Sequence, residues 1–225
     1  MQSMQVGPYI LQVRLLTHKD KDEIIHLQQK VYDALEQPEQ LQQLTLGEIE
    51  EILNQQLFAG AFYDNQLIAA RAFLRPVDDP EPLAQDVGIP EQQWNHVIYS
   101  EITIVDPEMQ GHGLQKKMGH WWLEKLQESD VAYICSTVAP FNIASMKDKF
   151  QLGMEIAALK PKYNGKLRYV FVKRLQQQVI SEGEKQRVRM DQIEQQQHLL
   201  AQGYRGIAME EDQHIWWIHY RKNRT

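Results

Sequence analysis

A glycine-containing segment, Val105 to Gln115, carries residue types that could bind an anion. It follows a β-rich run at residues 97–105 and leads into a helical pattern at residues 115–127. Gly111 and Gly113 lie in the turn between them, where glycine lets a ligand approach the backbone closely. The first backbone N–H groups of a helix have no partner within it and carry positive potential. The segment therefore predicts an anion site, with phosphate as the expected ligand.

The strand that leads into this turn carries candidate groups for proton transfer. Residues two apart face the same side of a regular strand, so Glu101 would share a face with Thr103 and Val105. Tyr99 has the same parity. A carboxylate in this position could act as a general base, and the phenol could relay a proton. A bulge in the strand would break this alignment, and Glu101 could equally be an exposed or paired strand carboxylate.

Other residues with chemical potential have simpler interpretations. Asn142 stands before a helical pattern at 143–152 and is a suitable N-cap. Cys135 lies in an apolar run and is expected to be a buried strand residue rather than a nucleophile. His214 and His219 flank two tryptophans, but no acidic or cysteine partner stands at ligand spacing. The sequence therefore predicts no metal site.

Composition indicates an ordinary globular protein. The chain has 225 residues, of which 43% are hydrophobic and 24% charged, and its only cysteine excludes an intramolecular disulfide. The net charge of -6 argues against nucleic acid as the main partner and is compatible with a cationic substrate. No apolar run approaches the roughly 20 residues that span a bilayer. Met1–Gln5 lacks the basic and apolar regions of a signal peptide, so we expect a cytoplasmic protein.

Periodicity and turn residues predict the elements that would hold these groups in place. In order they are a strand at 9–16, helices at 20–35 and 45–53, a hairpin of 57–63 and 66–74, the strand at 97–105, the helix at 115–127, a strand at 131–138, the helix at 143–152, and strands at 155–160 and 167–175. The Asp64-Asn65 pair favours the hairpin turn. The long segment 75–95 is either a solvated acidic loop or a flap over a substrate.

The composition changes after Leu175. Residues 176–225 are polar and partly repetitive, with a helix expected at 187–202 and a short hairpin formed by 207–209 and 214–220. Such a segment is too small to bury its own core. We therefore divide the chain into a domain at 1–175 and an extension at 176–225, which packs on the domain or on a second subunit of a homodimer.

Two motifs resemble those of the GCN5-related N-acetyltransferase (GNAT) superfamily. Its Gln/Arg-x-x-Gly-x-Gly/Ala signature is matched at the first four positions of Gln110-Gly111-His112-Gly113-Leu114-Gln115, whereas Gln115 replaces a small residue. Asn142-Ile143-Ala144-Ser145, with Leu152-Gly153-Met154 closing the helix, resembles a second family block. The resemblance covers residues 9–175.

The resemblance implies an α/β (α+β) fold with a mixed, mostly antiparallel central sheet, splayed at its middle and flanked by helices. It also implies acetyl-CoA as cosubstrate, with the pyrophosphate on backbone N–H groups from Gln110 to Gln115. The N–H groups near Thr103 and Val105 would bind the pantetheine and the acetyl carbonyl, which polarises the thioester. Asn142 would reach the pantetheine arm, or serve only as a helix cap.

The implied activity is direct acetyl transfer to a primary amine of a small molecule or peptide, with Glu101 as base. Residues 35–45 and 75–95 would build the acceptor pocket. Lys149 stands where the family often has a tyrosine that protonates the leaving thiolate, and it is either that acid or a solvated helix lysine. Lys149 and Gln115 motivate an alternative, a non-catalytic acyl-CoA sensor or interaction module.

Overall fold

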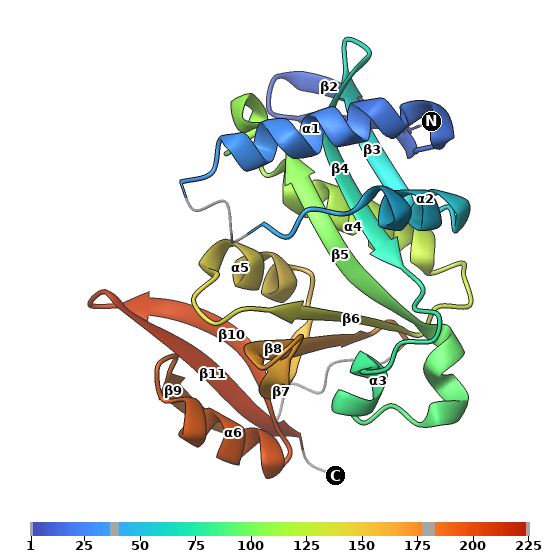
Figure 1. Ribbon diagram of the computed structural model, residues 1–225. Coiled ribbons are helices and arrows are strands. Elements are labelled where there is room, and N and C mark those ends of the chain that lie inside the picture. Colours follow the sequence, from blue (N-terminus) through green and yellow to red (C-terminus); the bar gives the residue numbers. More distant parts are fainter. Residues whose placement is uncertain (1, 37–40, 177–182, 224–225) are drawn as a thin grey trace. The chain divides into compact units, whose positions relative to one another are not determined.

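The computed structural model describes residues 2–36, 41–176 and 183–223. They group into two compact units, and Figure 1 labels helices and strands of both. Unit 1 comprises residues 1–75 and 99–129, and unit 2 comprises residues 76–98 and 130–225. Within the described residues, no helix is both long and apolar enough to cross a membrane.

The strands of unit 1 form antiparallel pairs in chain order. They are β1 (Gln2–Val6), β2 (Tyr9–Leu15), β3 (Phe58–Tyr63), β4 (Gln66–Leu74) and β5 (Val97–Val105), whose first two residues fall in unit 2. Asp64 and Asn65 join β3 to β4 with φ values of 47° and 63°. Positive φ at both central residues is the hairpin geometry expected of this pair.

Helices cover both faces of the unit 1 sheet. η1 (His18–Asp20) leads into α1 (Lys21–Asp33), and α2 (Leu46–Asn54) begins at a capping box. These two α-helices bury a core that includes Ala70 and Ala72 of β4. Phe73, which has the opposite parity to Ala70 and Ala72 along β4, packs on Trp122 of α4 (Leu114–Leu126), with ring centres 5.2 Å apart, so α4 covers the opposite face.

The strands of unit 2 also pair antiparallel. Their order is β6 (Tyr133–Val138), β8 (Lys166–Arg174), β7 (Glu155–Lys162), β10 (Tyr204–Asp212), β11 (Ile215–Asn223) and β9 (Gly183–Arg189). Its α-helices are α3 (Leu83–Asp86), α5 (Ile143–Gln151) and α6 (Ile193–Ala201), with a 3-10 helix, η3 (Glu91–His96). With antiparallel strands and flanking helices in both units, the predicted mixed α/β class is confirmed.

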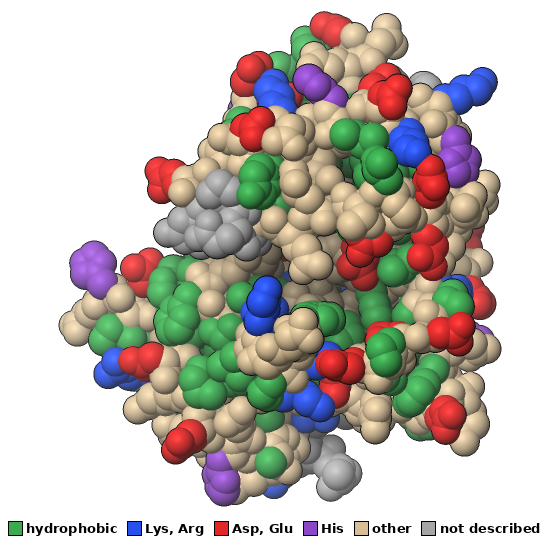
Figure 2. All heavy atoms as spheres, in the orientation of Figure 1, with side chains coloured by type: hydrophobic (Ala, Val, Ile, Leu, Met, Phe, Trp, Pro, Cys, Tyr) green, Lys and Arg blue, Asp and Glu red, His purple; other side chains and the backbone are tan. Residues whose placement is uncertain are grey.

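The segment after Leu175 shares the core of unit 2. Gly206 of β10 pairs with Ile156 of β7, and α6 packs against both strands. The prediction of a helix starting at residue 187 is wrong, because 183–189 form β9 and α6 begins at Ile193. Figure 2 shows hydrophobic side chains gathered on the surface over β10 and β11. The division at residue 175 stays a prediction.

The predicted long loop at 75–95 contains short helices and is anchored by lysines. Lys162 is almost fully buried, and its Nζ lies 2.8 Å from Asp86 Oδ2 and 2.6 Å from the Glu81 carbonyl oxygen. Lys160 Nζ reaches the other Asp86 oxygen at 2.6 Å. These contacts hold α3 against β7. The part of the segment around Glu81 and Asp86 is therefore not a solvated acidic loop.

Candidate functional site

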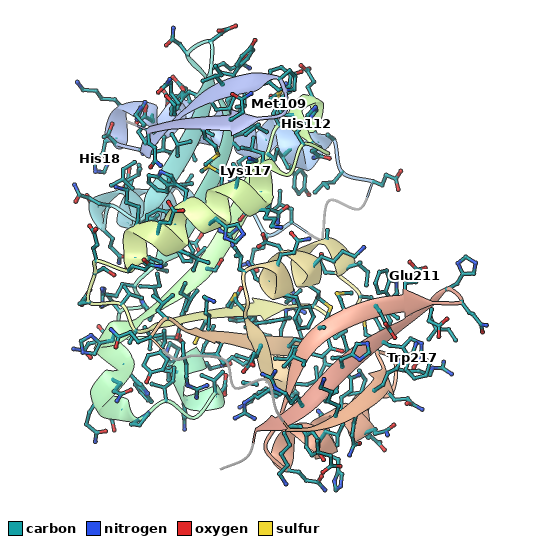
Figure 3. The ribbon with its side chains drawn as sticks, turned by 180° about the vertical axis from the view of Figure 1, so that it is seen from behind. His18, Met109, His112, Lys117, Glu211 and Trp217 are labelled. Atoms are coloured by element: carbon teal, nitrogen blue, oxygen red, sulfur yellow. The ribbon has the colours of Figure 1, made fainter. Side chains whose placement is uncertain are left out.

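The turn between β5 and α4 has the backbone geometry of an open cradle. β5 is followed by η4 (Pro107–Met109), and Gly111 and Gly113 then take φ values of 80° and 71°. Such values strain any residue with a Cβ. A Cβ built on either glycine would meet no heavy atom within 4 Å, so the space above both is open. Figure 3 shows Met109, His112 and Lys117 along this turn and the start of α4.

The N-terminus of α4 favours a negative ligand. Gly113 is its N-cap and offers no side chain, and the first turn contains no acidic residue. Leu114 is buried and holds the helix to the sheet, whereas the turn before it is exposed. The first N–H groups of the helix therefore keep their positive potential at the surface. Ligand binding at this turn stays a prediction.

The edge of β5 presents the backbone groups that the sequence singled out. The Asp106 N–H donates to the Ile68 carbonyl of β4 at 2.8 Å, which makes this a hydrogen-bonded pair of the ladder. Such pairs alternate along antiparallel strands, so Ile104 also bonds toward β4. The N–H groups of Thr103 and Val105 therefore point to the opposite edge of β5. This is the orientation that ligand binding by these groups would need.

β5 contains the bulge that would disturb the predicted alignment. Its register with β4 shifts between Arg71 and Phe73, so Glu101 and Ile102 together oppose Ala72. An additional residue in one strand moves every side chain on its far side to the other face. Alternation along β5 is therefore interrupted at the candidate base.

The prediction that Tyr99 shares a face with Thr103 is consequently wrong. Tyr99 pairs with Leu74, which packs against the α1 and α2 core, whereas Thr103 pairs with Arg71 on the α4 side. Glu101 is exposed at the bulge itself. Its role as a base stays a prediction.

A buried arginine, which the sequence analysis missed, lies beneath the start of α4. Arg71 has no exposed surface, and its guanidinium donates to the Gln115 carbonyl at 3.5 Å and to Ser100 Oγ at 3.4 Å. Its carbonyl accepts a 3.2 Å bond from Trp122 Nε1. The sequence could have indicated this residue, because Arg71 stands inside the otherwise apolar run of β4 and a buried charge must be held by partners.

The β1–β2 hairpin braces the other side of the turn. Lys117 Nζ donates to the Gln5 carbonyl at 2.7 Å, and Trp121 Nε1 donates to Gln2 Oε1 at 2.8 Å. The ring of His112 stands edge-on to Tyr9 with centres 5.5 Å apart. The tryptophan is thus a structural anchor, and the first strand of the chain contributes to the site's support.

Three candidates from the sequence lie in unit 2. Asn142 Oδ1 accepts the Ser145 N–H at 3.2 Å, which confirms the helix cap, while its contact with pantetheine stays a prediction. Cys135 is buried, and desolvation raises the pKa of its thiol to about 12, so it is a poor nucleophile. Lys149 is not a solvated lysine: its side chain is 9% exposed and its Nζ lies 3.3 Å from Asp148 Oδ2.

Unit 1 also contains a cavity of about 480 Å³. Its lining comes from α1, which includes Lys30, from the turn between β3 and β4 with the start of β4, and from Asp106. Across the parts of the chain that the structure describes, no group of three His, Cys, Asp or Glu side chains is arranged to hold a metal ion.

Solved structures with a similar fold include a GNAT-family acetyltransferase and other acetyltransferases. A GNAT-family acetyltransferase from Listeria monocytogenes 4b F2365 is 19% identical with a TM-score of 0.60, over 77% of this chain and 99% of that one. The ribosomal-protein-S18-alanine N-acetyltransferase of Escherichia coli is 14% identical with a TM-score of 0.54, over 76% and 98%. The yncA protein of Salmonella typhimurium, solved with its cofactor acetyl-CoA, is 11% identical with a TM-score of 0.55, over 76% and 98%.

The chain therefore has the GNAT fold, and the resemblance seen in its motifs is confirmed at the level of architecture. The identities are too low to carry activity or substrate from these proteins to this one. The sequence matches no protein-family model, and no curated protein matches it.

Proposed function

We propose that this protein is an acetyl-CoA-dependent N-acetyltransferase that transfers the acetyl group directly to a primary amine of a small molecule or peptide. The observation that carries the proposal is the open turn at Gly111 and Gly113, at an uncapped helix N-terminus, within a GNAT fold. The pyrophosphate of acetyl-CoA would accept hydrogen bonds from backbone N–H groups between Gln110 and Gln115.

The edge of β5 suits the reacting end of the donor. The N–H groups of Thr103 and Val105 point away from β4, and one of them would donate to the thioester carbonyl. The amine nitrogen attacks the carbonyl carbon, and the developing oxyanion is stabilised by that donor. The C–S bond then breaks, the thiolate of CoA leaves, and the proton of the amine passes to Glu101 directly or through water.

The base assignment rests on Glu101 alone. The bulge places Tyr99 on the face opposite Thr103, so this mechanism gives Tyr99 no part in proton transfer. Glu101→Gln keeps the size of the side chain and removes its basicity. We expect kcat to fall about 100-fold while the affinity for acetyl-CoA is unchanged. An unchanged kcat would remove Glu101 as the base.

The direct test is acetyl-CoA binding by calorimetry, followed by CoA release with a panel of amines. The panel contains polyamines, aminoglycosides, amino acids and peptide N-termini. We expect saturable binding and turnover with at least one class. Binding without turnover of any amine would support the alternative, an acyl-CoA sensor, which the buried Lys149 at the family's tyrosine position favours. Absence of binding would reject both.

Gly113→Ala tests the turn itself. The new methyl group would enter the open space above the backbone, where the pyrophosphate is expected. We expect affinity for acetyl-CoA to fall at least about 10-fold, and the free energy of unfolding to fall by about 1 kcal/mol from strain at positive φ. Calorimetry and urea denaturation measure the two effects.

Gly165→Ala is the matched control. Gly165 has φ 85° in the turn between β7 and β8, and a Cβ there also meets no atom within 4 Å. The Gly165→Ala variant should lose a similar free energy of unfolding and keep its affinity for acetyl-CoA. Equal losses of affinity in both variants would show that strain, and not occupation of the turn, weakens binding.

A further inference from the structure

Asp106 fixes the point at which β5 passes into the glycine turn. Its carboxylate is buried, and Oδ1 accepts the Glu108 N–H at 3.0 Å, which caps η4. Its own N–H donates to Ile68 of β4 at 2.8 Å, and its carbonyl accepts the Met109 N–H at 2.8 Å. Backbone and side chain together thus define the path of the chain just before Gln110.

The second carboxylate oxygen of Asp106 is held by a lysine from a distant element. Lys30 Nζ lies 2.8 Å from Asp106 Oδ2 and 3.4 Å from Glu108 Oε1. The hydrogen bond to Asp106 is the largest of the effects that raise the pKa of Lys30. The lysine is on α1, which is anchored in the core by neighbours such as Leu27 and Val31. The ion pair therefore ties the entry of the turn to a rigid helix.

The turn needs such an external support. Gly111 and Gly113 have more accessible conformations than any other residue type, so the turn's own backbone does little to define its shape. Ordering it on binding would reduce affinity, and a preformed geometry avoids that loss. Asp106 is separated from Gln110 only by η4, so a fixed Asp106 restricts the first residue of the cradle.

We propose that Lys30 and Asp106 are positioning residues for the cofactor, and that their ion pair holds the turn from Gln110 to Gly113 in its acetyl-CoA-binding geometry. The inference rests on the proposed function and deepens it. Neither residue is assigned a contact with the cofactor. The pair acts through η4 on the backbone that makes the contacts.

If Asp106 affects acetyl-CoA binding only through its charge, its substitution should have the opposite effect on affinity from that expected of a positioning residue. Acetyl-CoA is an anion, so removing a nearby carboxylate would strengthen its binding if only electrostatics mattered. Asp106→Asn removes that charge and the ion pair, yet its amide oxygen can still cap Glu108. If positioning matters, binding weakens although an unfavourable charge has been lost. This variant therefore separates the two effects.

The experiment measures acetyl-CoA affinity by calorimetry and backbone amide exchange of residues 106–116 without ligand. We expect Asp106→Asn and Lys30→Met each to weaken binding about 10-fold and to speed exchange in this segment. The double variant should be no weaker than the poorer single one, because the two residues act as a unit. Lys30→Arg keeps the charge and should restore most of the affinity.

Lys21→Met is the matched control, since Lys21 is also on α1 and forms an ion pair with the exposed Glu50. It should change neither affinity nor exchange. Circular dichroism confirms that each variant is folded before comparison.

Wild-type affinity, or tighter binding, in Asp106→Asn would overturn the inference. If the wild-type protein does not bind acetyl-CoA, the proposed function fails, and the cofactor role of the pair fails with it. The exchange comparison would still decide whether the pair orders the turn.

Discussion

At the scale of single residues, this protein relies on carboxylates that are held by several donors at once. Asp20 illustrates this before α1: Arg14 donates to both of its oxygens, at 2.8 and 2.6 Å, and Thr17 donates through its N–H and its hydroxyl. The carboxylate is nearly buried. These bonds, with that from Arg14 first, lower the pKa of Asp20 from 3.8 to about 2.

Asp20 should therefore make stability depend on pH in a defined window. Its folded pKa is below its unfolded value, so its contribution is complete above about pH 4 and is lost as the pH falls toward 2. Asp20→Asn should lower the free energy of unfolding by about 1–2 kcal/mol at pH 7 and flatten its pH dependence between 4 and 2. Urea denaturation across this range measures both, with the exposed Asp22→Asn as control. An unaltered slope in Asp20→Asn would contradict the assignment.

Single residues were predictable where their chemistry is local. Gly111 and Gly113 could be assigned from sequence because a positive φ and a close approach are properties of glycine itself. The pairing of Lys30 with Asp106 joins positions far apart in the chain, and no spacing rule connects them. Lys149 looked solvated because its burial depends on tertiary packing around α5.

At the scale of elements, a buried amide on α6 links this helix to two strands of the unit 2 sheet. Gln196 is fully buried, and its Oε1 accepts hydrogen bonds from the hydroxyl groups of Tyr169 and Tyr220, both at 2.8 Å. Its Nε2 donates to the Met190 carbonyl at 2.8 Å. One side chain thus connects β8, β11 and the segment after β9.

Gln196→Ala should be strongly destabilising because it leaves two buried phenols without their acceptor. We expect a loss of about 2–4 kcal/mol in the free energy of unfolding. Gln195→Ala, at the exposed neighbouring position of the same helix, should cost well below 1 kcal/mol. Thermal or urea denaturation compares the two. Similar losses in both variants would show that the buried network contributes little.

Elements with a strong periodic pattern were predictable, and the edge strands were not. The helices at α1 and α2 and the β3–β4 hairpin follow from apolar spacing and turn residues. β1 is short and mostly polar, and β9 is polar and charged, so neither shows a sustained apolar alternation of the kind that identifies a half-buried strand. Such composition is typical of strands at the edge of a sheet. The bulge in β5 left no mark on its apolar pattern.

At the scale of the whole molecule, each unit contains its own tryptophans. Trp121 and Trp122 are in unit 1, and Trp94, Trp216 and Trp217 are in unit 2. The proposed cradle belongs to unit 1. A ligand that binds only the folded state stabilises it by about 2.7 kcal/mol at 100 times its Kd.

Ligand stabilisation should therefore be visible in the fluorescence of unit 1. In a variant with Trp94, Trp216 and Trp217 replaced by Phe, the unfolding transition reported by the remaining tryptophans should move by about 2.7 kcal/mol with acetyl-CoA at 100 times its Kd. Adding Gly113→Ala to this variant should reduce the shift to about 1.4 kcal/mol or less at the same concentration, because the affinity is at least about 10-fold lower. If acetyl-CoA binds but does not shift this unfolding transition, the binding site lies outside unit 1.

The bulge in β5 has a consequence for any change in the length of this strand. Before Glu101–Ile102 and after it, successive side chains alternate between the two faces of the sheet, but the alternation is offset by one residue between the two parts. Deleting Ile102 would remove the extra residue and bring the whole strand into one phase. Ser100 and Tyr99 would keep their partners Phe73 and Leu74, and Ser100 would stay beside the guanidinium of Arg71. Glu101 would then stand alone opposite Ala72, on the face that packs against the core of α1 and α2. The extra residue thus allows a carboxylate at this point of the strand to stay out of the core, and a one-residue deletion would force it inward.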